Sequence, residues 1–328
     1  MRVLVVTNMF LSGNGNWVAE QVRSLQAEGL EVDVIFFDTK RTRLFYGMTL
    51  PRIINAIRSG KYDLVHTHHT YTMLLLEVAR KLARTRVPVV LTNHEAEILD
   101  RDGRTLTWHP TSHLRHSLGV KKFAASRADF VIFVAHQLAS ALAFNGRHDI
   151  IPCGVDLEKF RPMDHGECRR RLGVPEEAMV IFFPASPRNA RKRFSLAEQA
   201  YAIVRSEIPQ ALMLTGGGIS ADEMPYYYNA ADVVLQTSFC EASPTIVKEA
   251  LACEVSVIST DAGDTREVLD GLAHCAICPE DAESIAAQIL ALSGCRPVGS
   301  RELLRRKQLA LEQVAQRIAS VYQQTLGP

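Results

Sequence analysis

The segment Phe239-Cys-Glu-Ala-Ser-Pro-Thr-Ile-Val-Lys-Glu-Ala-Leu-Ala-Cys253 carries two carboxylates eight positions apart, Glu241 and Glu249. Its pattern predicts a loop followed by a helix. Ser243 is expected to cap the helix and Pro244 to be its first residue, a position where the missing N–H breaks no hydrogen bond. The amides of the first turn would then be free to bind an anion such as a diphosphate.

The two carboxylates add a second kind of ligand group to this anion site. Thr245 and Glu249 share one helical face, and side chains on a helix lean toward its N-terminus, which carries Glu249 back toward the phosphates while Lys248 points elsewhere. Ionised carboxylates only accept hydrogen bonds, and the hydroxyls of ribose and hexose can donate them. The segment therefore indicates a sugar-nucleotide site. The alternative is an acidic loop before an ordinary amphipathic helix.

Three further segments extend the pattern along the chain. They are Met224-Pro-Tyr-Tyr-Tyr-Asn-Ala-Ala-Asp-Val-Val-Leu235, Val257-Ile-Ser-Thr-Asp-Ala-Gly-Asp-Thr-Arg-Glu-Val268 and Ile151-Pro-Cys-Gly-Val-Asp-Leu-Glu-Lys-Phe-Arg-Pro162. Together with the Glu-x7-Glu spacing they resemble the retaining glycosyltransferases of family 4, in particular short bacterial members of surface-polysaccharide synthesis. Cys153 stands where that family usually has Asn. The resemblance covers nearly the whole chain and is weakest around residues 38–60 and 96–120.

Composition describes a globular protein without an export signal. The 328 residues are 47% hydrophobic, enough to fill two cores, and the net charge of +1 gives no overall attraction to nucleic acid. No apolar run approaches the ~18 to 20 residues that span a bilayer, so we expect a cytoplasmic protein. Seven cysteines, an odd number, suggest reduced thiols. Cys275 and Cys278 could hold zinc, but residues 273–277 are expected to form a short strand whose cysteines are buried.

Apolar segments alternate with helical patterns in both halves of the chain, which predicts two parallel sheets covered by helices. The expected strands are residues 2–7, 32–37, 64–67, 87–92 and 130–134, then 179–183, 211–215, 232–235 and 255–259. The fold class is α/β, and the resemblance implies GT-B: two Rossmann-like domains facing across a cleft. The expected domains are 1–155 on the acceptor side, 163–305 for the donor, and a helix in 306–328 that returns to the first domain, within a helical stretch from Ser300 to Tyr322.

Two loops are predicted to bind the phosphates of the donor. Gly13 and Gly15 let the backbone after the first strand approach a ligand, and the resemblance implies that this loop lies under the donor phosphate and the acceptor. Arg188, Arg191, Lys192 and Arg193 follow the first strand of the second domain, at the edge where open α/β sheets bind ligands. By resemblance, Arg188 and Lys192 form the phosphate-binding pair, whereas Arg191 and Arg193 are expected to face water.

His94, at the end of a predicted strand, resembles the family histidine that faces the transferred sugar, although a capping or buried role is the alternative. His68 is expected to be scaffolding. His109, His113 and His116 mimic the spacing of metal ligands, but Pro110 is expected to start a helix that leaves His109 outside it.

The sequence thus predicts a metal-independent, retaining hexosyltransferase that needs no cofactor. Glu241, His94, Lys192 and Arg188 would act on a nucleotide-diphosphate sugar, with a UDP-sugar favoured over a GDP-sugar. The acceptor would be a sugar or a lipid-linked sugar. Basic and aromatic residues in 40–48 and 115–123 could rest on a membrane, or form ordinary surface.

Two other classes of protein stay open. A dinucleotide-dependent oxidoreductase is suggested by Gly13, Gly15 and Asp38. A non-catalytic sugar-nucleotide sensor would keep Glu241 and Glu249 without turnover.

Overall fold

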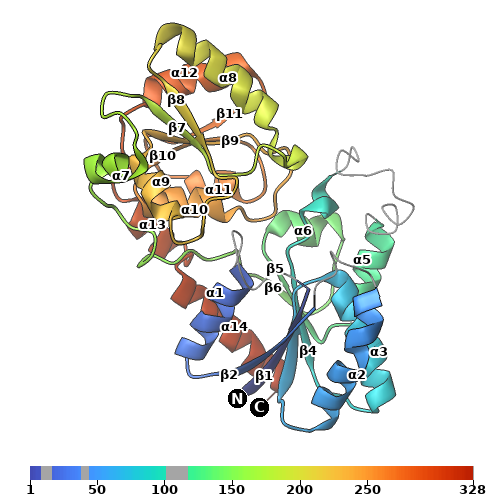
Figure 1. The fold of residues 1–328 in the computed structure, drawn as a ribbon. Coiled ribbons are helices and arrows are strands. Elements are labelled where there is room, and N and C mark those ends of the chain that lie inside the picture. Colours follow the sequence, from blue (N-terminus) through green and yellow to red (C-terminus); the bar gives the residue numbers. More distant parts are fainter. Residues whose placement is uncertain (9–16, 38–43, 101–116, 328) are drawn as a thin grey trace. The chain divides into compact units, whose positions relative to one another are not determined.

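The computed structural model describes residues 1–8, 17–37, 44–100 and 117–327, which form two compact units. Unit 1 consists of Met1–Pro152 together with Val314–Pro328, and unit 2 of Cys153–Gln313. Each unit has its own parallel sheet with helices on both faces (Figure 1).

The sheet of unit 1 has six strands in the order β2-β1-β3-β4-β5-β6. The strands are β1 (Arg2–Thr7), β2 (Glu31–Phe36), β3 (Leu64–Thr67), β4 (Val89–Asn93), β5 (Phe130–Phe133) and β6 (His148–Ile150). The inner strands β3, β4 and β5 are buried along their whole length. Their continuous apolar sequences follow from this burial, because helices cover both faces of the sheet.

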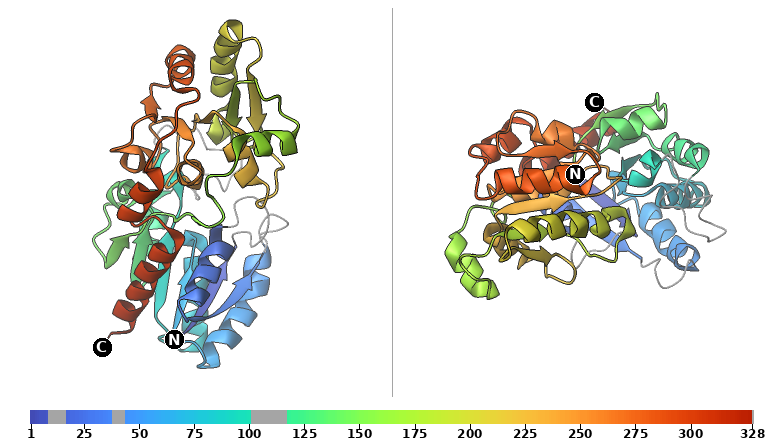
Figure 2. Two further views of the ribbon diagram at one scale, coloured as in Figure 1. Left: turned by 90° about the vertical axis from the view of Figure 1, so that its left-hand side faces the viewer. Right: turned by 90° about the horizontal axis from the view of Figure 1, so that it is seen from above.

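The helices of unit 1 form one layer on each face of this sheet (Figures 1 and 2). One layer holds α1 (Trp17–Ala27) and α14 (Leu311–Leu326), and the other holds α2 (Leu44–Arg58), α3 (Thr70–Ala83) and α5 (Leu118–Ala125). Two short helical elements, η1 (Ala96–Leu99) and α6 (His136–Ala141), follow β4 and β5.

The helix α14 belongs to the core of unit 1 although the chain reaches it from unit 2. Val314, Ile318 and Tyr322 are buried in one cluster with residues of α1 and of the sheet. The helical stretch expected from Ser300 is interrupted, because α13 (Ser300–Arg306) ends before α14 begins. Between them Gln308 has φ 56°, and Ala310 forms an isolated parallel bridge with Val155.

The sheet of unit 2 has five strands in the order β11-β10-β9-β7-β8. These are β7 (Val180–Phe183), β8 (Leu212–Thr215), β9 (Val233–Gln236), β10 (Ser256–Thr260) and β11 (Ala276–Cys278). One face packs against α8 (Phe194–Glu207) and α12 (Ala282–Leu292). The other packs against α9 (Met224–Ala230), α10 (Thr245–Ala252), α11 (Thr265–Leu269) and α13. The unit also contains α7 (His165–Leu172) and η2 (Ala190–Lys192).

The predicted α/β class with two Rossmann-like units is confirmed, and the nine strands expected from apolar alternation lie within two residues of the observed ones. The strand expected at residues 273–277 is observed as Ala276–Cys278. His274 has φ 61°, a left-handed conformation that ends extended structure, so the strand starts after it. The edge strand β6 was missed because its three residues include His148 and Asp149.

Candidate active site

The candidate site lies at the carboxyl edge of the sheet of unit 2, where the strand order reverses. From β7 the chain passes to β8 on one side, and it then crosses to β9 on the other side of β7. Open α/β sheets bind ligands at such a switch point, outside the carboxyl ends of the strands. The loop after β7 carries Lys192, and the loop after β9 carries Glu241.

Lys192 and Glu241 form an ion pair in which Lys192 Nζ lies 2.6 Å from Glu241 Oε1. Arg191 Nη2 lies 3.8 Å from Glu241 Oε2. The side chain of Glu241 is only 8% exposed, and this burial by itself raises its pKa. Lys192 and Arg191 outweigh the burial, so that the pKa of Glu241 is lowered below its ordinary value. Glu241 is therefore an ionised carboxylate at neutral pH.

The loop after β7 is held to the end of β9 by backbone and hydroxyl contacts. The Thr237 hydroxyl donates to the carbonyl oxygens of Lys192 and Arg193 over 2.8 and 3.0 Å. The N–H of Phe239 donates to the carbonyl of Arg191 over 3.3 Å. These bonds fix the backbone from which Lys192 reaches Glu241.

The expectation that Arg191 and Arg193 face water is wrong. Arg191 approaches Glu241, whereas Arg193 donates from Nη1 to Glu280 Oε2 at 2.6 Å and from Nε to the carbonyl of Thr237. Three of the four cations in this loop, Arg191, Lys192 and Arg193, thus have carboxylate partners that lie dozens of residues away in the sequence. Arg188, which was predicted to pair with Lys192 on phosphate, is an exposed side chain in the same loop.

Ser243 does not cap α10. The helix begins at Thr245, the cap position is Pro244, and no side chain bonds to the cap amides. The hydroxyl of Ser243 instead donates to Asp264 Oδ2 over 2.6 Å and accepts from Lys248 Nζ and from the N–H of Cys153. The reason is that a buried ammonium needs oxygen partners, and within the described part of the chain Lys248 has Ser243 and Asp264.

Lys248 and Asp264 form a fully buried ion pair behind the first turn of α10. Lys248 Nζ lies 2.9 Å from Asp264 Oδ2, and the two side chains are 0% and 2% exposed. The preceding residue, Gly263, has φ +62°, and a Cβ there would collide with the carbonyl oxygen of Ala242. The N–H of Asp264 donates to that same carbonyl over 3.1 Å. The loop from Glu241 to α10 is therefore clamped against the loop after β10.

Glu249 lies on α10 with its side chain half-buried, as does Thr245 four residues earlier. Its Oε2 accepts a hydrogen bond from the hydroxyl of Tyr228 on α9 over 2.6 Å. The sequence did not single out Tyr228, because nothing in the run of three tyrosines from Tyr226 shows which ring turns toward α10.

His94 follows β4 in unit 1 and adjoins a row of buried rings. The centroids of His94 and His68 are 5.7 Å apart, and those of His68 and His66 are 4.3 Å apart. His66 contacts the Tyr322 hydroxyl through Nδ1 at 2.6 Å and Thr92 Oγ1 through Nε2 at 2.7 Å. Burial lowers the pKa of His68 to about 3, and it lowers the pKa of His66 and of His94 well below the ordinary value. The three rings are neutral at physiological pH.

Several predicted residues lie outside the described part of the chain. They are Gly13, Gly15, Asp38, His109, His113 and His116. Among the described residues, no group of three or more His, Cys, Asp and Glu side chains is arranged to hold a metal ion. Cys275 is partly buried and accepts from the N–H of Val257, and burial raises its pKa to about 11. Across the described residues, none of the helices combines the length and the apolar character needed to cross a bilayer.

Two family models match most of the chain. The model for Glycosyltransferase Family 4 matches residues 11–159, and that for Glycosyl transferases group 1 matches residues 187–294, which include the Lys192–Glu241 pair and α10. A two-unit α/β transferase is the class that the fold and the matched segments define. The chain belongs to glycosyltransferase family 4.

Curated relatives agree with this assignment. The chain is 25% identical over 245 residues to the putative teichuronic acid biosynthesis glycosyltransferase TuaC of Bacillus subtilis, covering 69% of this chain and 60% of that protein. It is 26% identical over 283 residues to the D-inositol 3-phosphate glycosyltransferase of Geodermatophilus obscurus, covering 75% and 61%. The chain thus spans about three fifths of the length of these relatives.

Among solved structures, the sucrose-phosphate synthase of Thermosynechococcus elongatus matches 99% of both chains, with a TM-score of 0.78 and 18% identity. HepE of Anabaena in complex with UDP-glucose matches 98% of this chain and 99% of its own, with a TM-score of 0.73 and 16% identity. These likenesses show the GT-B fold that the resemblance implied.

Proposed function

We propose that this chain is a retaining glycosyltransferase that moves a sugar from a nucleotide-diphosphate sugar to a hydroxyl acceptor in the synthesis of a cell-surface polysaccharide or glycolipid. The Lys192–Glu241 ion pair at the switch point of unit 2 carries the proposal. It places an ammonium group and an ionised carboxylate at the edge where a diphosphate and a sugar would meet. UDP is favoured as the nucleotide because the structurally similar HepE is a complex with UDP-glucose.

Each group of the site has a defined part in this reaction. The bond between the anomeric carbon and the diphosphate breaks as the acceptor oxygen bonds to that carbon from the same face, and the acceptor proton passes to a phosphate oxygen of the donor. Lys192, Arg188 and the first amides of α10 stabilise the charge that grows on the leaving diphosphate, so no metal is required. Glu241 orients the hydroxyls of the donor sugar, and Glu249 binds the ribose. Neutral His94 donates or accepts a hydrogen bond at the sugar.

Binding and product analysis test the proposal together. Calorimetry with UDP, GDP and NAD distinguishes the base and the oxidoreductase alternative, since an oxidoreductase would bind NAD in preference to UDP. Turnover of UDP-glucose with the anomeric configuration read by NMR then tests retention. An inverted product would contradict the mechanism, and donor binding without hydrolysis or transfer would identify a non-catalytic sensor.

The acceptor side of the proposal includes peripheral contact with an anionic membrane, because the layer of α2, α3 and α5 has an unusual composition. The sequences of these helices contain six Lys and Arg side chains and a single carboxylate, Glu77, whereas α1 and α14 on the opposite face carry two of each sign. Glu77 is paired with Arg127 at 2.6 Å. Lys121 is buried and paired with Glu95 at 3.4 Å, so the other five cations supply the positive charge of this layer.

Apolar side chains are exposed on the same three helices. They supply five of the eight large apolar side chains that the described residues expose, namely Met48, Val78, Leu82, Leu118 and Phe123. A surface that combines cations with protruding apolar groups matches the interface of a bilayer that contains acidic lipids.

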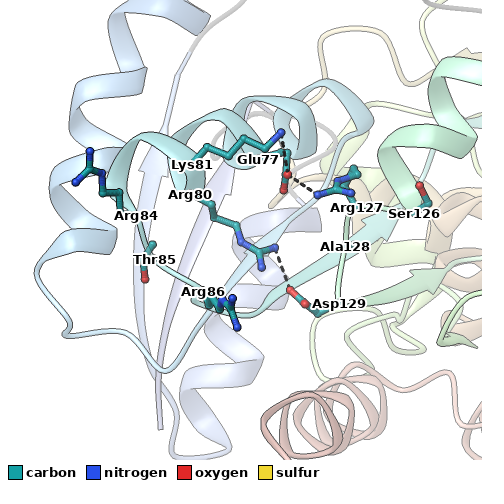
Figure 3. Close-up of a pocket in the computed structure, with 10 residues that line it drawn as sticks. All are labelled: Glu77, Arg80, Lys81, Arg84, Thr85, Arg86, Ser126, Arg127, Ala128 and Asp129. Atoms are coloured by element: carbon teal, nitrogen blue, oxygen red, sulfur yellow. Dashed lines mark hydrogen bonds and ion pairs between the residues drawn. The ribbon is translucent and has the colours of Figure 1, made fainter.

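A cavity of about 550 Å³ opens between α3, the start of β4 and the turn before β5 (Figure 3). Two of its cations, Arg80 and Arg127, point to the carboxylates of Asp129 and Glu77. Arg84 and Arg86 are exposed and have no ion pair with any described residue. We propose that these two arginines bind lipid phosphates.

Co-sedimentation with vesicles tests the membrane contact. Vesicles of phosphatidylcholine with phosphatidylglycerol should bind the protein, and phosphatidylcholine alone should not. Arg86→Glu should weaken binding, because a cation near an acidic surface contributes about 1 kcal/mol. Phe123→Ser should also weaken binding, because it removes one of the exposed apolar side chains. Arg23→Glu, an exposed arginine on α1, is the matched control and should bind normally. Equal loss in the control, or binding to both kinds of vesicle, would contradict the proposal.

A further inference from the structure

Tyr228 is a fully buried tyrosine whose hydroxyl has a defined partner. Its ring, on α9, meets the rings of Phe160 and Phe182 edge-on, with centroids 5.8 and 5.2 Å away. Its hydroxyl donates to Glu249 Oε2 over 2.6 Å, and no other hydrogen bond of this hydroxyl is recorded among the described residues. Because the core packs closely around the ring, the hydroxyl cannot turn to another partner without opening the core.

We propose that Tyr228 is a positioning residue for nucleotide binding, which holds the carboxylate of Glu249 in the orientation that accepts hydrogen bonds from the ribose hydroxyls. The inference rests on the proposed function, because it assigns Glu249 to the ribose. Tyr228 itself does not touch the nucleotide.

The side chain of Glu249 shows why a hydrogen bond from Tyr228 would favour nucleotide binding. A half-buried glutamate on a helix samples several rotamers, and fixing one of them on binding costs free energy. The bond from Tyr228 restricts Glu249 before the ligand arrives. It occupies one lone pair of Oε2, and an ionised carboxylate has about four acceptor positions in all. Burial and the neighbouring Glu249 raise the pKa of Tyr228 well above its ordinary value, so the hydroxyl remains a donor.

A purely structural role is the alternative. A buried hydroxyl requires a partner, and Glu249 could serve only to satisfy Tyr228. The two roles differ in one measurable respect. A positioning residue affects nucleotide binding only through Glu249 and only when the ribose carries its hydroxyls, whereas a structural residue affects folding regardless of the ligand.

The first measurement is the affinity for UDP by calorimetry. Tyr228→Phe removes one oxygen and keeps the buried ring, so the fold is retained. The dissociation constant should rise roughly three- to tenfold, the effect of one hydrogen bond. At saturating donor, kcat should change little because the diphosphate clamp is intact. The matched control is Tyr227→Phe, since the neighbouring ring packs on Phe182 and has no recorded bond to Glu249.

The second measurement separates the two roles. In a Glu249→Ala background, Tyr228→Phe should cause no additional loss of UDP affinity, and 2′,3′-dideoxy-UDP should bind equally to wild type and Tyr228→Phe. The positioning role would be overturned if Tyr228→Phe lost the same affinity in the Glu249→Ala background or for 2′,3′-dideoxy-UDP. Unchanged UDP affinity with a lowered melting temperature would also overturn it. If wild type binds no nucleoside diphosphate, the proposed function itself fails. Normal wild-type binding with no effect of Tyr228→Phe overturns the positioning role alone.

Discussion

Lys192 and Glu241 are 49 positions apart in the sequence, yet Lys192 Nζ and Glu241 Oε1 are 2.6 Å apart, in the loops that follow β7 and β9. Glu241 has lost nearly all its contact with water and is kept ionised by this cation. Removing the charge of Lys192 should therefore raise the pKa of Glu241 as well as change the electrostatics of the site.

Replacing Lys192 by Met should impair the transfer step more than donor binding. If the ammonium stabilises the departing diphosphate, kcat falls by a larger factor than the donor KM rises, with a loss on the order of 2 to 4 kcal/mol in the transition state. Lys192→Arg keeps the charge and should retain part of the activity. Steady-state kinetics on the two variants decide the matter, and an effect on KM alone would assign Lys192 to ground-state binding.

The ion pair also predicts how stability depends on acid. The folded-state pKa of Glu241 is below the ordinary value of 4.5, so its contribution to stability is present above pH 4.5 and disappears as the pH falls through the lower folded-state value. In Lys192→Met the pKa of Glu241 should rise, and the acid-unfolding midpoint should move to higher pH. Melting temperatures measured across this range for both proteins provide the test; coincident curves would contradict it.

The buried histidines predict a second dependence on pH, at higher values. His66 and His68 stay neutral in the fold, whereas in the unfolded chain they take up protons below about pH 6.5. Stability should therefore decrease as pH falls from about 6.5 toward 5, by up to about 1.4 kcal/mol per pH unit for each histidine. His68→Gln should flatten this slope in denaturant titrations. An unchanged slope would mean that His68 is protonated in the fold.

Removing one charge of the Lys248–Asp264 pair should lower the free energy of unfolding strongly, whereas replacing both residues by apolar ones should lower it much less. Lys248→Met leaves the carboxylate of Asp264 buried without its cation and should destabilise the protein by about 3 to 5 kcal/mol. Adding Asp264→Leu removes the second charge and should restore much of that loss. Urea unfolding of the single and double variants measures the coupling. Additive losses would show that the two charges act independently.

Chelation tests the proposal that cations of the chain replace a metal. Turnover and melting temperature should both survive excess EDTA, because in the proposed mechanism Lys192, Arg188 and the first amides of α10 stabilise the leaving diphosphate in place of a metal. A loss of turnover alone would contradict the cationic mechanism. A fall in melting temperature would instead indicate a structural metal, since a chelator removes the folding energy that such a metal supplies.

The sequence was a good guide wherever the information is local. Apolar segments predicted the strands, and the rule that ligands bind beyond the carboxyl ends of parallel strands singled out the loop of Lys192. Glu241 was singled out by its spacing to Glu249. The roles of both residues stay predictions.

The errors concern partners that are distant in the chain. Ser243 has the residue type of a helix cap, but its hydroxyl bonds to Asp264, 21 residues later. Arg193 belongs to a run of charges that usually faces water, but Glu280 is its partner, 87 residues away. Local propensity carries no information on such contacts, because tertiary packing decides them.

The membership of α14 in the core of unit 1 has a consequence for how the protein is made. Residues 153–313 are continuous, so unit 2 can fold as soon as they leave the ribosome, whereas the core of unit 1 is incomplete until Ile318 and Tyr322 have been synthesised. Until then the ring of His66 lacks the hydroxyl of Tyr322, and the face of the sheet under α14 stays open to water. The half of the chain that is translated first is thus the half that finishes folding last, the reverse of the usual order for multidomain proteins.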